Sequence, residues 1–132
     1  MFAITKPLDP SDTMQMSPVV LAFVGDAVET LYVRTALSLD CGAKTGKLHR
    51  LTADKINAHS QAVSASKVQP LLTETEAEVF RHGRNTHTQS RAKNASPVDY
   101  HNATGFEALL GYLYLTGQSE RISFLLSVAF SE

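Results

Sequence analysis

The chain has little cysteine and no long apolar run, and each shortage excludes a class of protein. Cys41 is the one cysteine among 132 residues, so no disulfide can form within the chain, which fits a reducing compartment. No segment approaches the ~20 apolar residues of a membrane span, and residues 1–16 lack the apolar core of a signal peptide. We therefore expect a cytoplasmic protein without a membrane-spanning segment.

Strand patterns are also scarce, because alternation of polar and apolar residues does not persist anywhere in the chain. Ser17-Pro18 and Ser96-Pro97 are typical of helix starts. Thr73 and Glu76 have the spacing of a capping box, and Gly117 is typical of a helix end. The sequence thus predicts an all-α fold, with an irregular lead-in over 1–16, one domain over 17–132, and helices near 18–39, 45–72 (with a break near 52–54), 74–83, 97–116 and 118–130.

Positive charge gathers in the middle of the chain, although the net charge is only -1. Residues 79–98 contain no acid, and residues 44–55 contain only Asp54. Such clusters suit a polyanion, but two solvated helix ends would give the same pattern. The lysines and arginines concerned are Lys44, Lys47, Arg50 and Lys55 in one segment and Arg81, Arg84, Arg91 and Lys93 in the other.

Two acidic residues stand inside segments that are otherwise apolar. Asp26 lies in the run 19–28, which is apolar on every side of a helix and is therefore expected to be buried. Glu107 lies in the similar run 105–111. An ionised carboxylate in such surroundings is costly unless it is paired or binds a metal.

Each of these acids has a glycine nearby, Gly25 beside Asp26 and Gly111 one turn after Glu107. Glycine inside a helix is unfavourable by roughly 0.5–1 kcal/mol, and it is usually tolerated where another backbone comes close. The two helices would then cross with their carboxylates facing each other and a cation between them. Oxygen ligands alone favour a hard ion such as magnesium. In the alternative, each acid pairs with a buried arginine or accepts backbone hydrogen bonds.

Other catalytic chemistry has no support in the sequence. Cys41 has no nearby histidine signature, and no serine-containing elbow motif is present. The histidines do not have zinc-ligand spacing with cysteines or acids, as the positions of His49, His59, His82, His87 and His101 show.

Two separated motifs resemble the signature of the ribonuclease III family. Residues 21–28 (LAFVGDAV) resemble the helix that carries a Phe-Leu-Gly-Asp-Ala-Val core in that family, and residues 106–115 (FEALLGYLYL) resemble its second catalytic helix. The resemblance spans about residues 17–127, and we expect no double-stranded-RNA-binding domain to follow it. Further segments are similar to the Mini-III branch of the family, namely Tyr32-Val33-Arg34, Lys47-Leu48-His49-Arg50, Arg81-His82-Gly83-Arg84-Asn85, Pro97, and Tyr100 with Thr104.

The resemblance implies a ribonuclease III endonuclease-domain-like helical bundle and a metal-dependent enzyme that hydrolyses phosphodiester bonds of double-stranded RNA. It implies that Asp26 and Glu107 are the catalytic, metal-binding acids, with Mg²⁺ as cofactor and Mn²⁺ as a substitute. The products would carry 5′-phosphate and 3′-hydroxyl ends. It also suggests maturation of precursor large-subunit ribosomal RNA, in a bacterial cytoplasm or a plastid stroma.

RNA binding and dimerisation follow from the same resemblance. A-form RNA is read mainly through phosphates and 2′-hydroxyls. The family forms homodimers that present two sites to two strands, and apolar faces near Phe23, Val24 and Tyr112 are expected to supply the interface. The turn within 81–85 is expected to enter a groove. The residues expected to contact RNA are Lys47, His49 and Arg50 in one cluster and Arg81, Arg84, Asn85 and Lys93 in the other.

Several acids of the larger ribonuclease III enzymes are missing. Ala22 and Val19 stand where those enzymes have glutamates, and Thr104 stands where they have an aspartate. This reduced set of acids is expected for the Mini-III branch. A second metal ion would then have to be coordinated by waters and RNA phosphates. Relatives more often have an aromatic residue followed by glutamate where this chain has Glu29-Thr30. Since Glu29 points about 100° away from the family position, we carry no role over to it.

Two other functions compete with the nuclease interpretation. A non-catalytic RNA-binding or ribosome-assembly protein on the same fold would have lost an acid, whereas Asp26 and Glu107 are both present. An all-α nucleotide pyrophosphohydrolase typically carries Glu-x-x-Glu pairs on one helix. The acids of residues 74–78 lie at a helix start, where the helix dipole explains them. The choice of substrate separates these functions: a nuclease cleaves duplex RNA, whereas a pyrophosphohydrolase hydrolyses a nucleoside triphosphate.

Overall fold

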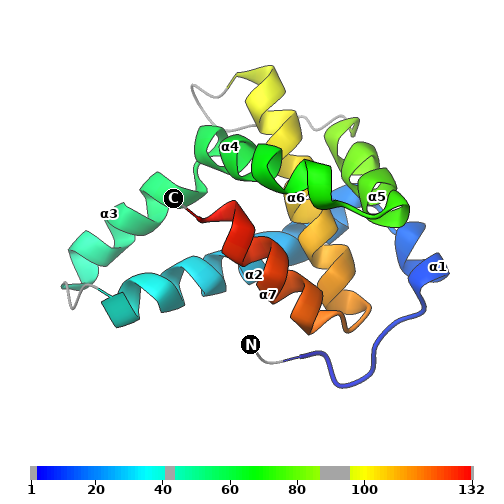
Figure 1. Ribbon diagram of the computed structural model, residues 1–132, viewed down its shortest axis with the longest axis horizontal. Coiled ribbons are helices and arrows are strands. Elements are labelled where there is room, and N and C mark those ends of the chain that lie inside the picture. The colour runs from blue at the N-terminus through cyan, green and yellow to red at the C-terminus, as the bar shows by residue number, and fades with distance from the viewer. Residues whose placement is uncertain (1–2, 41–43, 87–95, 132) are drawn as a thin grey trace.

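Figure 1 shows the computed structural model, which describes residues 3–40, 44–86 and 96–131. Within these ranges the chain contains helices and no strand, which confirms the predicted all-α class. No described helix is both long and apolar enough to cross a membrane. In chain order the elements are α1 (Pro10–Met14), α2 (Pro18–Asp40), α3 (Thr45–Ile56), α4 (Ala58–Val68), the 3₁₀ turn η1 (Gln69–Leu71), α5 (Glu74–Arg84), α6 (Pro97–Leu115) and α7 (Ser119–Ala129).

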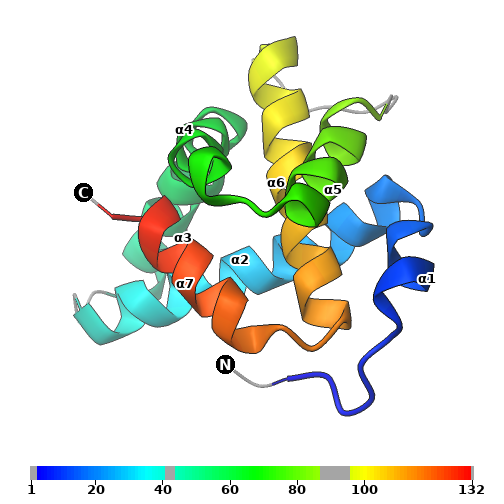
Figure 2. The ribbon, with the colours of Figure 1, turned by 45° about the vertical axis from the view of Figure 1, so that its right-hand side comes forward.

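Helix α6 forms the centre of the fold. Helices α2, α4, α5 and α7 all pack against it (Figures 1 and 2). Its apolar run is buried on every side, as expected for a helix without a polar face. The largest fully buried side chains come from α6 and α7, namely Phe106, Leu109, Leu110, Leu113, Ile122, Leu125 and Leu126.

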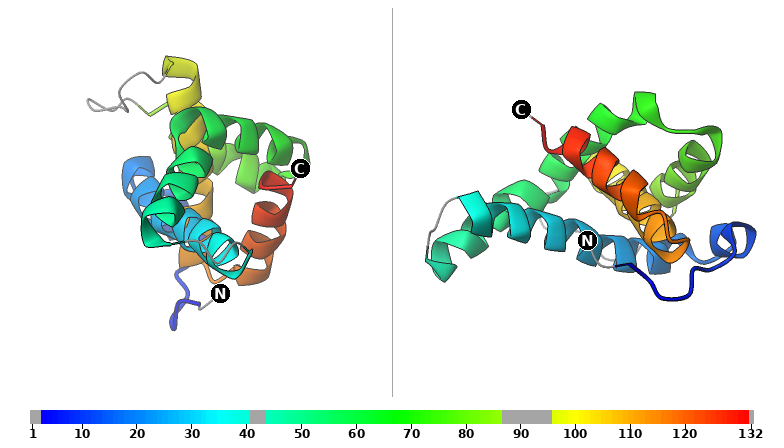
Figure 3. Two further views of the ribbon diagram at one scale, coloured as in Figure 1. Left: turned by 90° about the vertical axis from the view of Figure 1, so that its left-hand side faces the viewer. Right: turned by 60° about the horizontal axis from the view of Figure 1, so that its bottom comes forward.

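Helix α2 is buried on one face only, so the expectation that it would be buried all round is wrong. Leu21 and Val28 face the core, whereas Val19 and Val20 are 44% and 47% exposed and Phe23 is 81% exposed. The reason is that α6 covers one side of α2 and no other described element covers the opposite side. The C-terminal part of α2 extends beyond the bundle, where α3 packs against it (Figure 3).

Local signals for helix ends are confirmed at three positions. Thr73 and Glu76 form both hydrogen bonds of a capping box, at 2.9 and 3.2 Å. The Ser96 hydroxyl accepts a hydrogen bond from the Asp99 backbone N–H at 3.1 Å and caps α6. Gly117 has a φ of 77°, a left-handed conformation that glycine adopts readily, and it ends the helix before α7.

The predicted break within residues 45–72 lies in a different place. At Thr52 the helix continues, because its hydroxyl donates to the Leu48 carbonyl at 2.8 Å and its side chain is buried. The chain instead bends at Asn57, whose side-chain oxygen accepts a hydrogen bond from Ser60 N–H at 2.9 Å and so starts α4.

The lead-in over residues 1–16, expected to be irregular, contains the short helix α1. Pro10 occupies its first turn, and the buried Thr13 donates its hydroxyl to the Asp9 carbonyl at 2.8 Å. Leu8 N–H donates to the Leu115 carbonyl at 2.8 Å and holds this segment against the end of α6. The division of the chain into 1–16 and 17–132 stays a prediction.

A partly buried ion pair joins α5 to α7. Arg121 donates to both carboxylate oxygens of Glu76, at 2.8 and 2.9 Å, and also to the Leu71 carbonyl at 2.8 Å. Burial alone would raise the pKa of Glu76, but the hydrogen bonds from Arg121 and Thr73 outweigh it and lower this pKa. The hydrogen bonds from Arg121 and Thr73 therefore offset the cost of burying the Glu76 carboxylate.

Candidate active site

Helices α2 and α6 cross with their backbones in close contact at Gly25 and Gly111. A Cβ atom added to Gly25 would overlap the backbone carbonyl of Glu107, and one added to Gly111 would overlap the carbonyl of Leu21. The structure therefore places the two glycines against each other, as their spacing from the acids predicted. This contact is what brings Asp26 of α2 alongside Glu107 of α6.

The carboxyl groups of Asp26 and Glu107 lie close enough for hydrogen bonding between them to raise the pKa of Glu107. Asp26 is exposed, contrary to the expectation that it would be buried, and it lines an open groove on α2. Glu107 is mostly enclosed. Burial, the hydrogen bond with Asp26, and the charges of Asp26 and Glu29 together raise the pKa of Glu107 to about 9 from its usual 4.5.

Glu29 is a third acid of this group, and the sequence interpretation gave it no role. It follows Asp26 by three residues on α2, so both side chains lie on the same side of the helix. Its side chain is fully buried, and Gln61 of α4 donates a hydrogen bond to its Oε1 atom at 2.6 Å. Burial and the Asp26 charge raise the pKa of Glu29 to about 7, although the Gln61 hydrogen bond opposes them.

Gln61 was also missed by the sequence interpretation. The helix 58–68 is only weakly periodic, and no motif marks one of its polar residues as buried. Gln61 lies close enough to Glu107 to lower the pKa of that acid by hydrogen bonding. We call Asp26, Glu29, Gln61 and Glu107 the carboxylate cluster.

The alternative explanation of the two acids, pairing with a buried arginine, does not hold for the described residues. The ion pairs found there join other side chains. No set of three His, Cys, Asp or Glu side chains in the described ranges is arranged to hold a metal ion alone. Two facing carboxylates without a basic partner still fit a magnesium ion, which keeps several waters and takes one or two protein carboxylates.

An apolar groove adjoins the carboxylate cluster. It has a volume of about 530 Å³, and Asp26 forms part of its wall. Tyr112, expected on this face, is buried in the core, and Tyr114 lines the groove instead. The other lining residues all belong to α2, namely Phe23, Val24, Ala27, Val28 and Leu31.

The structure does not bring the two predicted RNA-binding clusters together. Lys47, His49 and Arg50 are exposed on α3, and α3 and α5 lie at opposite ends of the molecule (Figures 1 and 2). On α5, Arg81 lies 3.7 Å from Glu78, and the Arg84 side chain donates to Asn85 at 3.4 Å.

The segment 81–85, expected to be a turn, is mostly the last turn of α5. Gly83 is buried within that helix, where an added Cβ would approach the Gly105 Cα at 2.9 Å. Lys93, with His87 and Arg91, lies outside the described residues.

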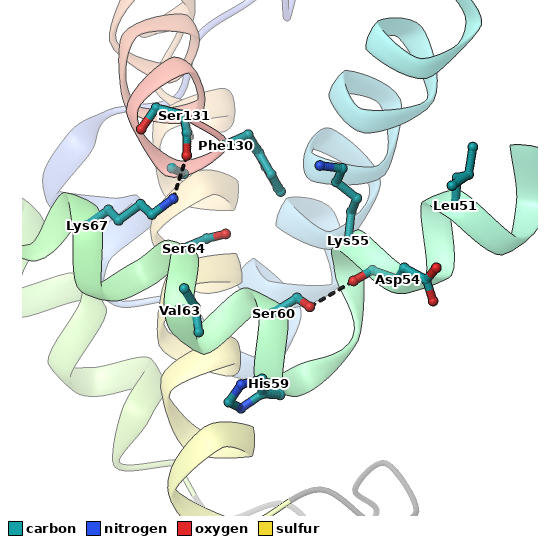
Figure 4. Close-up of a pocket in the computed structure, with 11 residues that line it drawn as sticks. Leu51, Asp54, Lys55, His59, Ser60, Val63, Ser64, Lys67, Phe130 and Ser131 are labelled. Atoms are coloured by element: carbon teal, nitrogen blue, oxygen red, sulfur yellow. Dashed lines mark hydrogen bonds between the residues drawn. The ribbon is translucent and has the colours of Figure 1, made fainter. Parts of the chain in front are cut away.

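A second hollow, of about 350 Å³, lies between α3, α4 and the end of α7 (Figure 4). Hydrogen bonds cross its walls: Ser60 donates to the Asp54 carbonyl at 2.7 Å, and Lys67 donates to the Ser131 carbonyl. His59, also in the wall, pairs with Asp99 of α6 at 2.9 Å. The hollow shares no lining residue with the carboxylate cluster, so it is a separate feature of the fold.

Comparison with known proteins relates this geometry to a family. A sequence model described as "Ribonuclease III domain" matches residues 19–118, which include both Asp26 and Glu107. A protein named Mini-ribonuclease 3 from Thermoanaerobacter sp. (strain X514) is 40% identical over 125 residues, which cover 95% of this chain and 88% of the relative. Its namesake from Clostridium tetani (strain Massachusetts / E88) is 44% identical over 112 residues, covering 84% and 74%.

A solved structure has the same arrangement of helices. The crystal structure of a Fusobacterium nucleatum protein superposes with a TM-score of 0.78 at 28% sequence identity, covering 86% of this chain and 91% of that one. Together, the sequence matches and this superposition confirm the family resemblance and the helical-bundle fold that residues 21–28 and 106–115 predicted.

Proposed function

The chain belongs to the ribonuclease III family and is an endoribonuclease of that family, and we propose that it uses Mg²⁺ to hydrolyse phosphodiester bonds of double-stranded RNA. The observation that carries this proposal is the pair of facing carboxylates, Asp26 and Glu107, held together where Gly25 meets Gly111. We further propose, from the name shared by the relatives and the resemblance of the motifs, that the substrate is precursor large-subunit ribosomal RNA and that the enzyme acts in the cytoplasm or a plastid stroma.

Asp26 and Glu107 are the residues that would hold the cation, with Mn²⁺ as a substitute for Mg²⁺. When bound, the ion supplies an activated water and positive charge for the phosphorane-like transition state. Asp26 is exposed and so faces the side from which a phosphate can approach. Glu107 carries a proton at neutral pH in the metal-free protein, because its pKa is about 9, and it must release that proton when the cation binds.

The basic residues on α3 and at the end of α5 support binding of a rod-shaped polyanion. Because α3 and α5 lie at opposite ends of the molecule, a duplex would have to lie along the molecule to contact both. We propose contacts to phosphates and 2′-hydroxyls, which are the groups that A-form RNA presents to proteins. The residues concerned are Lys47, His49 and Arg50 on α3, Arg81, Arg84 and Asn85 at the end of α5, and Lys93.

The exposed side of α2 supports a homodimer. Phe23 is 81% exposed beside a groove lined mainly by apolar side chains, and a large apolar face next to a site is typical of protein interfaces. Since Asp26 borders the same groove, a second copy seated there would bring its own carboxylate cluster close to the first. Two sites could then act on the two strands of one duplex.

Substitution of Phe23 with glutamate is expected to give a folded monomer, because the side chain contacts little of its own chain and a charge would oppose burial between subunits. Sedimentation equilibrium measures the mass. Leu39→Glu is the matched control: Leu39 is equally exposed, at 81%, but lies near the other end of α2, and this variant should keep the mass of two chains. A wild-type mass of one chain would contradict the dimer.

Cleavage of labelled RNA duplexes tests the function itself. We expect the wild-type protein to cut both strands of an RNA duplex in Mg²⁺ and to do nothing in EDTA. Single-stranded RNA and duplex DNA should remain intact. Asp26→Asn should bind the duplex without cutting it. Binding by the wild-type protein without cutting would favour the RNA-binding alternative, and hydrolysis of a nucleoside triphosphate in place of RNA would favour the pyrophosphohydrolase.

A further inference from the structure

We propose that Glu29 is an outer-sphere member of the metal site, whose Oε2 atom accepts a hydrogen bond from a water bound to the cation, and that Gln61 is the positioning residue that holds Glu29 for this task. The inference rests on the proposed function, since it concerns the cation held by Asp26 and Glu107. It gives a role to the one acid of the carboxylate cluster that the motifs of residues 21–28 and 106–115 do not include.

The placement of Glu29 suits this role. It lies one helical turn after Asp26 on the same side of α2, and its charge acts on Glu107 of α6. Its side chain is completely buried. Burying a carboxyl group costs more than burying an apolar side chain of similar size, so packing alone does not account for a glutamate at this position.

The two oxygens of Glu29 have different surroundings. Oε1 accepts the hydrogen bond from Gln61 at 2.6 Å, whereas Oε2 is buried and has no hydrogen-bond partner among the described residues. A buried acceptor without a partner is unfavourable, and nearly all such atoms in proteins have a hydrogen-bond partner, from the protein or from water. Because Gln61 fixes one oxygen, the free oxygen is held in a defined position.

Contact through water, not direct ligation, fits the geometry. Asp26, Glu29 and Glu107 are not arranged as a set of three direct ligands. Magnesium keeps several of its waters when it binds to one or two carboxylates, and those waters need hydrogen-bond acceptors. Groups that hydrogen-bond to the ligands of a metal, without touching it, typically change its affinity by about 10–100-fold.

Glu29→Gln tests the proposal, because it keeps the shape of the side chain and removes its charge. We expect calorimetric titration of the folded protein to show about 10–100-fold weaker binding of Mn²⁺ and Mg²⁺. The matched control is Glu120→Gln, an exposed glutamate on α7, which should bind both ions as the wild type does. Gln61→Met should also weaken binding, since it removes the hydrogen bond and keeps the length of the side chain. If Glu29→Gln does not fold, Gln61→Met still tests the hydrogen bond between Gln61 and Glu29 from the α4 side.

The outcomes separate this inference from the proposed function. If the wild type binds Mg²⁺ and cuts duplex RNA while Glu29→Gln or Gln61→Met keeps full metal affinity, Glu29 is a structural acid and only the inference fails. If the wild type binds neither ion, the proposed function fails and the inference fails with it. Weak binding by Asp26→Asn together with intermediate binding by Glu29→Gln is the result that we expect.

Discussion

Glu107→Gln is expected to abolish RNA cleavage and, without metal, to make the fold more stable. Cleavage should fall by about 10³-fold or more, because a metal that polarises a phosphoryl group contributes several kcal/mol and each 1.4 kcal/mol is about tenfold. Stability should rise because the amide removes an acid that is costly to bury beside Asp26 and Glu29. If Glu107 served only the fold, Glu107→Gln would reduce both RNA cleavage and stability.

The gain in stability should depend on pH in a defined direction. Burial raises the pKa of Glu107 to about 9 and that of Glu29 to about 7, from 4.5 in each case. The unfolded chain releases these protons near pH 4.5, whereas the folded chain keeps them until higher pH. The contribution of these two groups to the free energy of unfolding of the metal-free wild type should therefore be most favourable below pH 4.5. It should be lost as the pH rises toward 9.

Urea unfolding in EDTA at pH 5, 7 and 8.5 measures this effect. We expect Glu107→Gln to unfold with a free energy about 1–3 kcal/mol above that of the wild type at pH 7, and with a flatter dependence on pH. Glu76→Gln is the matched control. Because Arg121 compensates Glu76 and its pKa is lowered, that variant should lose stability and keep metal binding. Equal stability of Glu107→Gln and the wild type at every pH would contradict the prediction.

The largest loss of stability is expected from Gly25→Ala or Gly111→Ala. In each case the new Cβ overlaps a backbone carbonyl, of Glu107 or of Leu21, and no side-chain rotation can remove the overlap. The helices α2 and α6 must therefore move apart. Overpacking of this kind costs about 1–3 kcal/mol and occasionally more, and we expect the upper end because the obstacle is backbone. Thermal unfolding and the cleavage assay should both show the loss.

Gly46→Ala provides the control for these substitutions. Gly46 lies in α3, and its added Cβ would meet nothing within 4 Å. There, alanine should stabilise the helix by about 0.4–1 kcal/mol, because it reduces the freedom of the unfolded chain. If Gly25→Ala unfolded at the same temperature as the wild type, the close crossing of α2 and α6 would be wrong, and with it the geometry of Asp26 and Glu107.

The sequence predicted those features of the site that depend on neighbours along the chain. The pairing of Gly25 with Asp26 and of Glu107 with Gly111 was visible because each pair interrupts an apolar run, and the structure places the two pairs at one crossing. Ser96 and Gly117 marked the ends of helices because capping and left-handed backbone need particular residue types.

Features that depend on distant segments escaped sequence reasoning. The run 19–28 carries the same apolar pattern whether one side of α2 or both are covered, so only the arrangement of helices decides that Phe23 is exposed and Tyr112 buried. Glu29 was likewise noticed in the sequence but given no role, because its partner Gln61 lies 32 residues away on another helix.

The sequence by itself therefore determined the long helices apart from the break between α3 and α4, the two facing acids and the family, since short-range periodicity, caps and contiguous motifs encode them. Only the tertiary structure added Glu29 and Gln61 to the carboxylate cluster and uncovered the groove beside Asp26. The physical reason is that burial and charge compensation depend on side chains from several helices, and the packing of α2, α4 and α6 sets which of those side chains meet.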